Sequence, residues 1–297
     1  MSQNVANAFV NMNIWELFCL HFKSETTSLS YWSDIQEFCR FTEKPFVKTE
    51  EEDVRAYFAF SKERVKRGKI SALTATKKFR ELHSFAVFTA EKDETAGSTF
   101  QDYFYPYLKG MAKEEKFARY IPIEDMDALL EAAKKDRMAY TILTLMYRAG
   151  LSSSEIVSLN SEENFALYEE GTYAIVQGRK EPCYIPEDAW NILEKYMKER
   201  QRFQSLFYNR SGRRLNSMYL SRMMRKYTKK AGIPPYSAQA VRNTCAYNFF
   251  AYGATKEQTA EQMGRTTLQI QRYRGIGYRD NLKKKANSLV KLKVEEP

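Results

Sequence analysis

One stretch of the sequence, residues 237–278, combines residue types that could act on a phosphate group. Arg242 and Arg265 supply permanent positive charge, and Tyr273 supplies a hydroxyl that could become a nucleophile. Phosphoryl transfer by a tyrosine requires its phenol, of pKa about 10, to lose a proton. It also requires cations near the non-bridging oxygens and an acid for the leaving alkoxide. The chemistry of this stretch therefore depends on which residues transfer the protons.

Two predicted helices position these residues. Apolar residues recur at helical spacing from Val241 to Phe250, which predicts a helix that Gly253 ends. A second short helix is expected from about Lys256 to Met263, with Gly264 as its C-terminal stop. The tyrosine follows this second glycine, after a pair of threonines.

This order resembles the C-terminal motif of the tyrosine recombinases, the phage integrase family. That motif begins with H-x-L-R-H-T on a helix, continues with L-G-H and ends at a nucleophilic tyrosine. The resemblance places the family's arginine on Arg242 and its tyrosine on Tyr273. It places Gln239 and Arg265 where the family has histidines, and Asn243 follows the arginine.

An earlier segment, GLSSSEI, resembles the family's tGLRxSEL box, whose arginine holds the scissile phosphate. Ser152 stands at the position of that arginine. The segment also has a complete structural explanation, because Gly150 can end one helix while Ser152 and Glu155 form a capping box for the next. Arg148 lies one helical turn earlier and could reach a phosphate, although it is not the aligned residue.

Residues 172–186 alternate in polarity and then turn at Gly178, which predicts a β-hairpin. The resemblance implies that this hairpin carries a lysine, the proposed acid for the leaving 5′ hydroxyl. Arg179 or Lys180 falls near that place. Because lysine can titrate whereas arginine stays protonated, Lys180 is the candidate acid.

Helices are also expected at residues 5–25, from Ser28 with Ser30 as a cap, from Thr49, and at 71–90. Their order resembles the core-binding domain that precedes the catalytic domain in the family. Predicted outward cations in the last of these helices, either DNA contacts or an ordinary solvated face, are Lys77, Lys78 and Arg80. Predicted contacts to the DNA backbone in the second domain are Arg179, Arg213, Arg214, Arg222, Arg225, Lys226 and Lys229.

The expected fold is mainly α with a small β-sheet, an α+β arrangement. Residues 1–112 are expected to form a helical, SAM-like core-binding domain, and residues 118–297 a domain of the tyrosine recombinase catalytic type. The end of the chain has an apolar stripe at helical spacing, formed by Leu282, Ala286, Leu289 and Val290. This stripe predicts a tail helix that packs on its own domain or passes to a neighbouring subunit.

Composition sets the remaining bounds. A net charge of +10 and a pI near 9.2 favour a polyanionic partner, which the resemblance specifies as double-stranded DNA. No run of eighteen apolar residues and no signal pattern appears, so a cytoplasmic protein without membrane contact is predicted. No cofactor or metal is expected, because the cysteines lack close spacing and are interpreted as buried thiols: Cys19, Cys39, Cys183 and Cys245.

Two functional hypotheses follow. His21 and His83, the two histidines, both lie in the first domain, so no imidazole stands near the site. We therefore favour a DNA-binding protein with an inactivated or weakened site, acting in recombination with copies of itself or with another recombinase. The alternative is an active, divergent recombinase that forms a 3′-phosphotyrosine through Tyr273, assisted by Arg242, Lys180 and Arg265. An unrelated helical DNA-binding regulator is a weaker third possibility, because the resemblance spans both domains.

Overall fold

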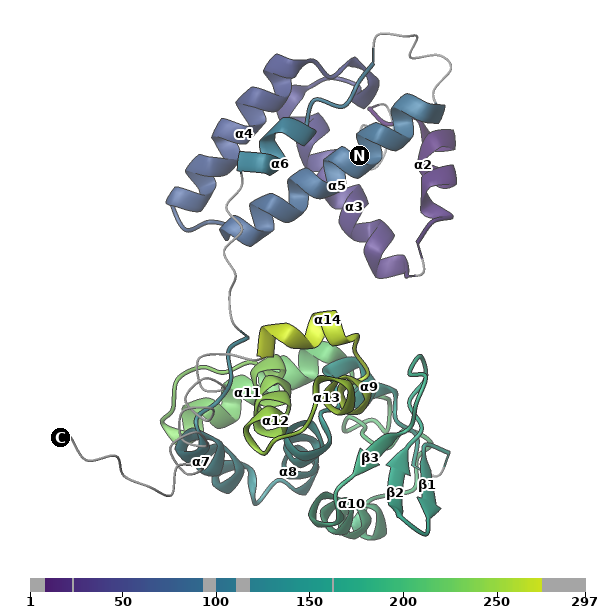
Figure 1. The fold of residues 1–297 in the computed structure, drawn as a ribbon, viewed down its shortest axis with the longest axis vertical. Helices are drawn as coiled ribbons and strands as arrows, with labels where there is room; N and C mark the ends of the chain where they lie inside the picture. Colours follow the sequence, from purple (N-terminus) through teal and green to yellow (C-terminus); the bar gives the residue numbers. More distant parts are fainter. Residues whose placement is uncertain (1–8, 23, 93–99, 111–117, 162, 274–297) are drawn as a thin grey trace, which may run out of the picture. The chain divides into compact units, whose positions relative to one another are not determined.

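A computed structural model describes residues 9–22, 24–92, 100–110, 118–161 and 163–273 of the chain (Figure 1). The chain divides into two compact units, Met1–Glu114 and Glu115–Pro297. The first unit is helical, and the second contains helices and one small sheet. The prediction of a mainly α fold with a small β-sheet is therefore confirmed.

The first unit is built from helices around an aromatic core. Its α-helices are α2 (Met12–Cys19), α3 (Glu25–Thr42), α4 (Glu51–Lys66), α5 (Ala72–Lys92) and α6 (Tyr105–Gly110), with the 3₁₀ turn η1 (Phe46–Lys48). Phe38, Phe46, Phe79 and Phe104 are almost fully buried, and Phe38 packs edge-on against Phe104 with ring centroids 5.1 Å apart. Burial of these apolar rings stabilises the unit, and edge-to-face pairs add an electrostatic attraction beyond the effect of the buried area.

Two predicted features of the first unit are wrong. The first predicted helix is shorter than residues 5–25 in the described part, and α3 begins after Ser24. Ser30 is therefore inside α3, where its hydroxyl bonds to the Glu81 carboxylate at 3.3 Å instead of capping the helix. The helix expected from Thr49 is α4, which has an acidic first turn and a capping box formed by Glu50 and Asp53.

Lys78 does not face outward as predicted. It is 7% exposed, and its ammonium group lies 2.6 Å from Asp34 Oδ1 and 3.2 Å from Glu37 Oε2. Lys77 is half exposed and pairs with Asp34 and Glu81. Arg80 is exposed and has no ion-pair partner within the described ranges. Carboxylates on other turns and helices thus neutralise two of the three cations that the sequence predicts as an outward basic face.

The second unit contains a larger set of short helices. Its α-helices are α7 (Ile123–Ala133), α8 (Arg137–Thr144), α9 (Ser153–Ser158), α10 (Glu187–Glu199), α11 (Ser217–Ala231), α12 (Ala238–Ala251), α13 (Lys256–Met263) and α14 (Thr267–Ile270). A π turn, η3 (Leu145–Ala149), and a 3₁₀ turn, η4 (Gln271–Tyr273), complete the described part. The predicted helix from Lys256 to Met263 is confirmed, and Gly264 ends it in the left-handed conformation with φ of 58°.

The sheet has three antiparallel strands in the order β1 (Phe165–Tyr168), β2 (Gly171–Ala174) and β3 (Cys183–Ile185). Thr172 pairs with Ile185 in the predicted hairpin, and Gly178 lies in its turn with φ of 88°. Strand β1 is not predicted. Ser205 and Tyr208 form only isolated bridges, with Asn160 and Arg214 respectively.

The remaining observations concern the cysteines, membrane-spanning helices and metal-binding groups. Three cysteines are buried as expected, but Cys19 is only partly buried. No helix of the described ranges is long and apolar enough to cross a membrane. Within the same ranges, no group of three or more His, Cys, Asp or Glu side chains could hold a metal ion. The predicted tail helix lies outside the described residues.

Candidate active site

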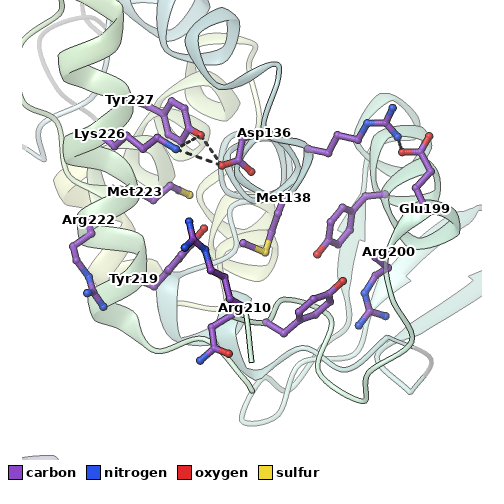
Figure 2. Close-up of a pocket in the computed structure, with 14 residues that line it drawn as sticks. Asp136, Met138, Glu199, Arg200, Arg210, Tyr219, Arg222, Met223, Lys226 and Tyr227 are labelled. Atoms are coloured by element: carbon purple, nitrogen blue, oxygen red, sulfur yellow. Dashed lines mark hydrogen bonds and ion pairs between the residues drawn. The ribbon is translucent and has the colours of Figure 1, made fainter. Parts of the chain in front are cut away.

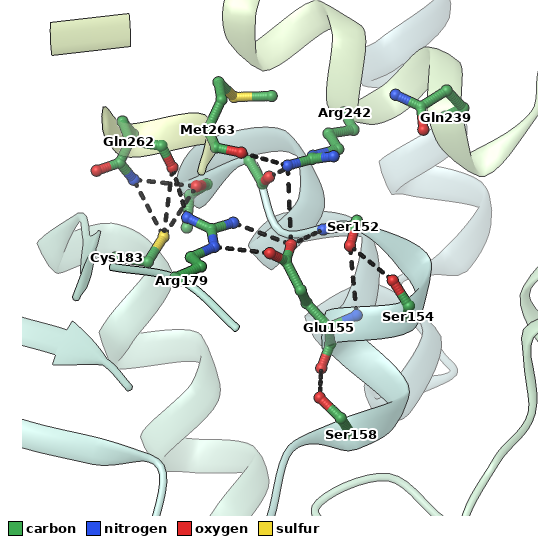
Figure 3. A network of polar contacts seen from close by, with 12 residues as sticks. Ser152, Ser154, Glu155, Ser158, Arg179, Cys183, Gln239, Arg242, Gln262 and Met263 are labelled. Carbon is green, nitrogen blue, oxygen red and sulfur yellow. Dashed lines mark hydrogen bonds and ion pairs between the residues drawn. The ribbon is translucent and has the colours of Figure 1, made fainter. Parts of the chain in front are cut away.

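The predicted site residues come from several elements of the second unit, and Figure 3 shows Ser152, Arg179 and Arg242 around Glu155. Arg242 and Gln239 come from α12, and Ser152 precedes α9. Arg179 and Lys180 lie between β2 and β3, and Arg265 follows α13. Ser152, Arg179 and Arg242, which are up to 90 residues apart in the sequence, therefore belong to one local cluster of polar groups around Glu155.

Arg242 is held in a fixed position below the surface. It is 1% exposed, and its Nε donates to the carbonyl of Gly150 at 2.7 Å. Its Nη2 donates a hydrogen bond to the carbonyl of Met263, and Nη2 lies 3.8 Å from Glu155 Oε2. Nη1 is buried and has no hydrogen-bond partner among the described residues. A buried donor without a partner costs free energy, so this arrangement favours an oxygen ligand at Nη1.

Glu155 is the centre of the cluster. Its two carboxylate oxygens accept from Arg179, from Nε at 2.7 Å and from Nη2 at 2.9 Å. The amide of Ser152 also donates to this carboxylate, at 2.6 Å. Burial opposes ionisation of Glu155, but the Arg179 hydrogen bonds and charge outweigh it, with help from Ser152 and Arg242, and lower its pKa to about 2. Glu155 is thus a fixed anion between two arginines.

Ser152 has the capping role that the sequence predicts. Its hydroxyl accepts from the Glu155 amide at 3.3 Å, and the Glu155 carboxylate returns a bond to the Ser152 amide. Position 152, where the resemblance expects an arginine, therefore carries no positive charge. Arg148, which lies one turn earlier, pairs with Asp188 at 2.7 Å.

Arg179 is placed differently from the prediction that it contacts DNA. Its side chain is 4% exposed, and besides Glu155 it donates from Nη1 to the carbonyl of Gln262 at 2.7 Å. A Cβ added to Gly264 would lie 2.8 Å from Arg179 Nε, so the absence of a side chain at Gly264 makes room for the guanidinium. Lys180, the next residue, is exposed. Arg179 therefore anchors the turn that presents Lys180.

Gln239 and Asn243 replace proton-transferring groups with amides. Gln239 is exposed and donates from Nε2 to Asn243 Oδ1 at 2.8 Å. Asn243 donates from Nδ2 to the carbonyl of Arg119 at 2.8 Å. Amide groups do not titrate near neutral pH, so neither residue can move a proton as an imidazole would. His83 lies in the first unit and pairs with Asp102 at 2.6 Å.

Tyr273 has a buried ring in the second unit. It is 7% exposed and packs in a small cluster with Cys245, Phe250, Met263 and Ile270. The ring therefore has a packing role in this cluster, whatever its hydroxyl does. The cluster also fixes its position relative to α12 and α13.

The charges around Arg242 show which predicted residues share its environment. Burial lowers the pKa of its guanidinium, and the Glu155 carboxylate opposes this shift. Arg265 and Arg179 lower the pKa of Arg242 further, whereas the Tyr273 hydroxyl raises it. Arg265 and Tyr273 are thus close enough to Arg242 to influence its charge. Arg265, Arg179 and Tyr273 therefore lie within electrostatic range of Arg242.

Gln262 is a site residue that the sequence did not indicate. Its Nε2 donates to the carbonyls of Ala149 and Tyr184, at 3.0 and 2.8 Å. It also lies 3.4 Å from the Cys183 sulfur, and burial raises the pKa of this thiol to about 11. These contacts join α13 to strand β3 and to the segment before Gly150. A glutamine in a short polar helix carries no local signal for such a role, and Gln262 is only half-buried.

The basic residues of α11 and the segment before it fall into distinct groups. Arg214 is held by the carbonyl of Val157 and by Asn160. Two residues line a pocket elsewhere in the unit, namely Arg222 and Lys226. Three remain exposed without a side-chain partner in the described ranges, namely Arg213, Arg225 and Lys229. Arg222 also lacks a side-chain partner in these ranges, since its Nε donates to the carbonyl of Met218.

Comparison with known proteins gives a family match within the second unit. The family model described as "Phage integrase family" matches residues 119–275. A protein described as "Tyrosine recombinase XerC" from Thermodesulfovibrio yellowstonii is 24% identical over 274 residues, which cover 82% of this chain and 83% of that protein. Another XerC, from Staphylococcus carnosus, is 25% identical over 262 residues, with 83% and 85% covered.

Solved structures show the same fold. A lambda integrase dimer bound to a COC′ core site matches with a TM-score of 0.72 at 14% identity, covering 93% of this chain and 96% of that one. The XerH site-specific recombinase bound to a palindromic difH substrate matches with a TM-score of 0.69 at 17% identity, covering 88% and 79%. At these identities the likeness concerns the fold.

Proposed function

Because this chain belongs to the phage integrase family of tyrosine recombinases, we propose that it binds duplex DNA in recombination and holds a phosphodiester at Arg242 without efficient cleavage. The observation that carries the proposal is Arg242 Nη1, a buried cationic donor without a partner in the described residues. Arg265, which is exposed and near enough to lower the pKa of Arg242, and Lys180, which is exposed on the turn after Arg179, add positive charge. XerH and lambda integrase, which share the fold, are bound to DNA in their structures.

The proposed weakness in cleavage follows from the residues around Arg242. Ser152 is used as a helix cap, so a second phosphate clamp is missing at this position. Removal of an arginine that stabilises a phosphoryl-transfer transition state costs roughly 10³ to 10⁵ in rate in other enzymes. Gln239 and Asn243 supply amides where a titrating group would assist proton transfer. In this proposal the chain acts as an accessory or regulatory factor.

An active, divergent recombinase is the second candidate. It is favoured by the position of Tyr273, which lies near enough to Arg242 to oppose, in part, the lowering of the arginine's pKa by burial. Lys180 is exposed on its turn and would be the acid for the leaving hydroxyl. Arg265 would replace part of the missing positive charge.

Binding is tested first with a duplex selected from a random pool. Fluorescence anisotropy at a series of salt concentrations should give a slope of log K against log salt of roughly −0.9 per phosphate neutralised. Tyr273→Phe should bind equally, because its hydroxyl makes no covalent bond in this proposal. Affinity that does not respond to salt, or no affinity for any duplex, would contradict the proposal.

The weakened site is tested by restoring both missing groups in one protein. Ser152→Arg with Gln239→His returns a phosphate clamp and a group that titrates near neutral pH. We expect this pair to produce cleavage that the unmodified chain lacks, at a stability cost of about 1 kcal/mol for the lost helix cap. The two changes are made together because residues that act as a unit are strongly non-additive. Equal cleavage before and after the changes would contradict a site weakened at these positions.

A further inference from the structure

A pocket of about 780 Å³ opens on the second unit, apart from the cluster around Arg242 (Figure 2). It lies between the start of α8, the end of α10, the segment at 208–210 and one face of α11. Met138 and Met223 lie among its lining residues. Four tyrosines complete its lining, namely Tyr196, Tyr208, Tyr219 and Tyr227. Methionine and tyrosine side chains suit an apolar or aromatic occupant with a polar edge.

The rim of this pocket carries excess positive charge. Its cations are Arg137, Arg200, Arg210, Arg222 and Lys226, and its acids are Asp136 and Glu199. Arg137 pairs with Glu199, and Lys226 lies 3.8 Å from Asp136. The other three arginines have no carboxylate partner in the part of the chain that the structure describes. An occupant that contributes carboxylates would therefore be favoured.

Arg200 adds a second sign of incomplete bonding at the pocket. Its Nη2 donates to the carbonyls of Phe203 and Ser205, and its guanidinium lies 5.1 Å from the centre of the Tyr208 ring. Its Nε is buried and has no hydrogen-bond partner among the described residues. The pocket thus holds an arginine whose hydrogen-bonding capacity is not filled within the unit.

The same chain carries a segment with the opposite properties. The end of strand β1 exposes two apolar side chains, Leu167 at 71% and Tyr168 at 57%. Glu169 and Glu170 follow and are both exposed. Tyr168 pairs with Gly171 across the end of the hairpin, so Glu169 and Glu170 form its two-residue turn, and the Tyr168 ring packs edge-on against Tyr173 with centroids 5.5 Å apart. We call residues 167–170 the acidic tip.

We propose that the acidic tip of one copy inserts into the pocket of a second copy. Leu167 and Tyr168 would lie against the methionines and tyrosines, and Glu169 and Glu170 would face the arginines that lack carboxylate partners. No residue of the tip lines the pocket of its own chain. The contact is therefore heterologous: each copy offers its tip to one neighbour and its pocket to another, an arrangement that closes into a ring or extends as a chain.

The size of the contact sets its expected strength. A four-residue tip covers much less than the roughly 1,200 Å² of a stable interface, so the contact should be weak between free chains. Binding of several copies to one DNA molecule would raise their effective concentration and therefore the fraction of copies that form the contact. Cross-linking, which accumulates a transient contact, is the appropriate assay.

The first arm places one cysteine on each partner. Protein with Glu169→Cys is mixed with protein carrying Arg210→Cys, and a short bis-maleimide is added. Both proteins also carry Cys19→Ser, because Cys19 is partly exposed while the other native cysteines are buried. A covalent dimer should form in the mixture at a yield at least several-fold above that of either protein alone. The matched control replaces Arg210→Cys with Arg55→Cys, which is on the first unit and 64% exposed.

The second arm reverses the charges in the cross-linking background. Glu170→Arg in the tip protein should abolish the excess yield, and so should Arg222→Glu in the pocket protein. When both reversals are present in the same mixture, the yield should return, which a folding defect could not produce. Circular dichroism of each variant checks that it is folded. A yield equal to that of the Arg55→Cys control, or a yield unchanged by charge reversal, would overturn the proposal.

Discussion

Neutralising Glu155 is the perturbation whose effect the structure defines most sharply. In Glu155→Gln the side chain keeps its size and one acceptor, but Arg179 loses its only anionic partner among the described residues and Arg242 loses its nearest one. Both side chains of the Arg179 pair are shielded, with exposures of 4% and 16%. Removal of one partner from such a pair leaves a buried charge unpaired. We expect the second unit to be destabilised.

Two independent estimates agree on the size of the effect. The pKa of Glu155 falls from its ordinary 4.5 to about 2, which corresponds to roughly 3 kcal/mol of stability. Breaking a buried ion pair costs about 3 to 5 kcal/mol in other proteins. Because the pKa is lowered on folding, this stability is fully present above pH 4.5 and is lost as the pH falls through 2.

The assay follows urea unfolding by pulse-labelling hydrogen exchange, which reports peptides of the second unit separately. At pH 7, Glu155→Gln should lower the free energy of unfolding by roughly 3 kcal/mol, and the difference from the unmodified chain should shrink as the equilibration pH falls from 4.5 towards 2. Glu131→Gln is the matched control, since Glu131 is 71% exposed and forms a surface pair with Lys134. Such pairs contribute between about 0 and 1 kcal/mol. Equal effects of the two changes would refute the central role given to Glu155.

Two further predictions concern Arg179 and its surroundings. Arg225→Ala should reduce the slope of log K against log salt for duplex binding by roughly 0.9, whereas Arg179→Met should leave the slope unchanged, because the Arg179 side chain bonds within the protein. Anisotropy titrations compare the two variants, and a smaller slope for Arg179→Met would show that Arg179 contacts DNA. Gly264→Ala should destabilise more than Gly232→Ala, since both glycines have positive φ but only the Cβ at 264 would meet Arg179. Urea unfolding measures the difference, and equal losses would mean that the contact with Arg179 is easily relieved.

Local signals explain what could be predicted from the sequence. The capping box of Ser152 and Glu155 and the stop at Gly264 depend on residues at most a few positions apart, and both are confirmed. The hairpin with Gly178 in its turn has the same local character. Strand β1 is not predicted, because it has only four residues and acidic residues follow it directly.

Long-range pairing explains what could not be predicted. Lys78 and Asp34 are 44 residues apart, and Arg179 and Glu155 are 24 apart. Nothing in the neighbourhood of a basic residue reveals a carboxylate that the fold brings to it, so both cations look like surface charges in the sequence. The same limit applies to Gln262, whose partners lie on other elements.

The central claim is that this site holds a phosphodiester without efficient cleavage. It is tested most directly with a duplex selected for binding, nicked beside each phosphate in turn so that a cleaved end diffuses away and any covalent protein–DNA adduct accumulates. The unmodified chain should bind the nicked duplexes and yield no more adduct than Tyr273→Phe on denaturing gels. An adduct that the unmodified chain forms and Tyr273→Phe abolishes would contradict the claim and identify the protein as an active recombinase.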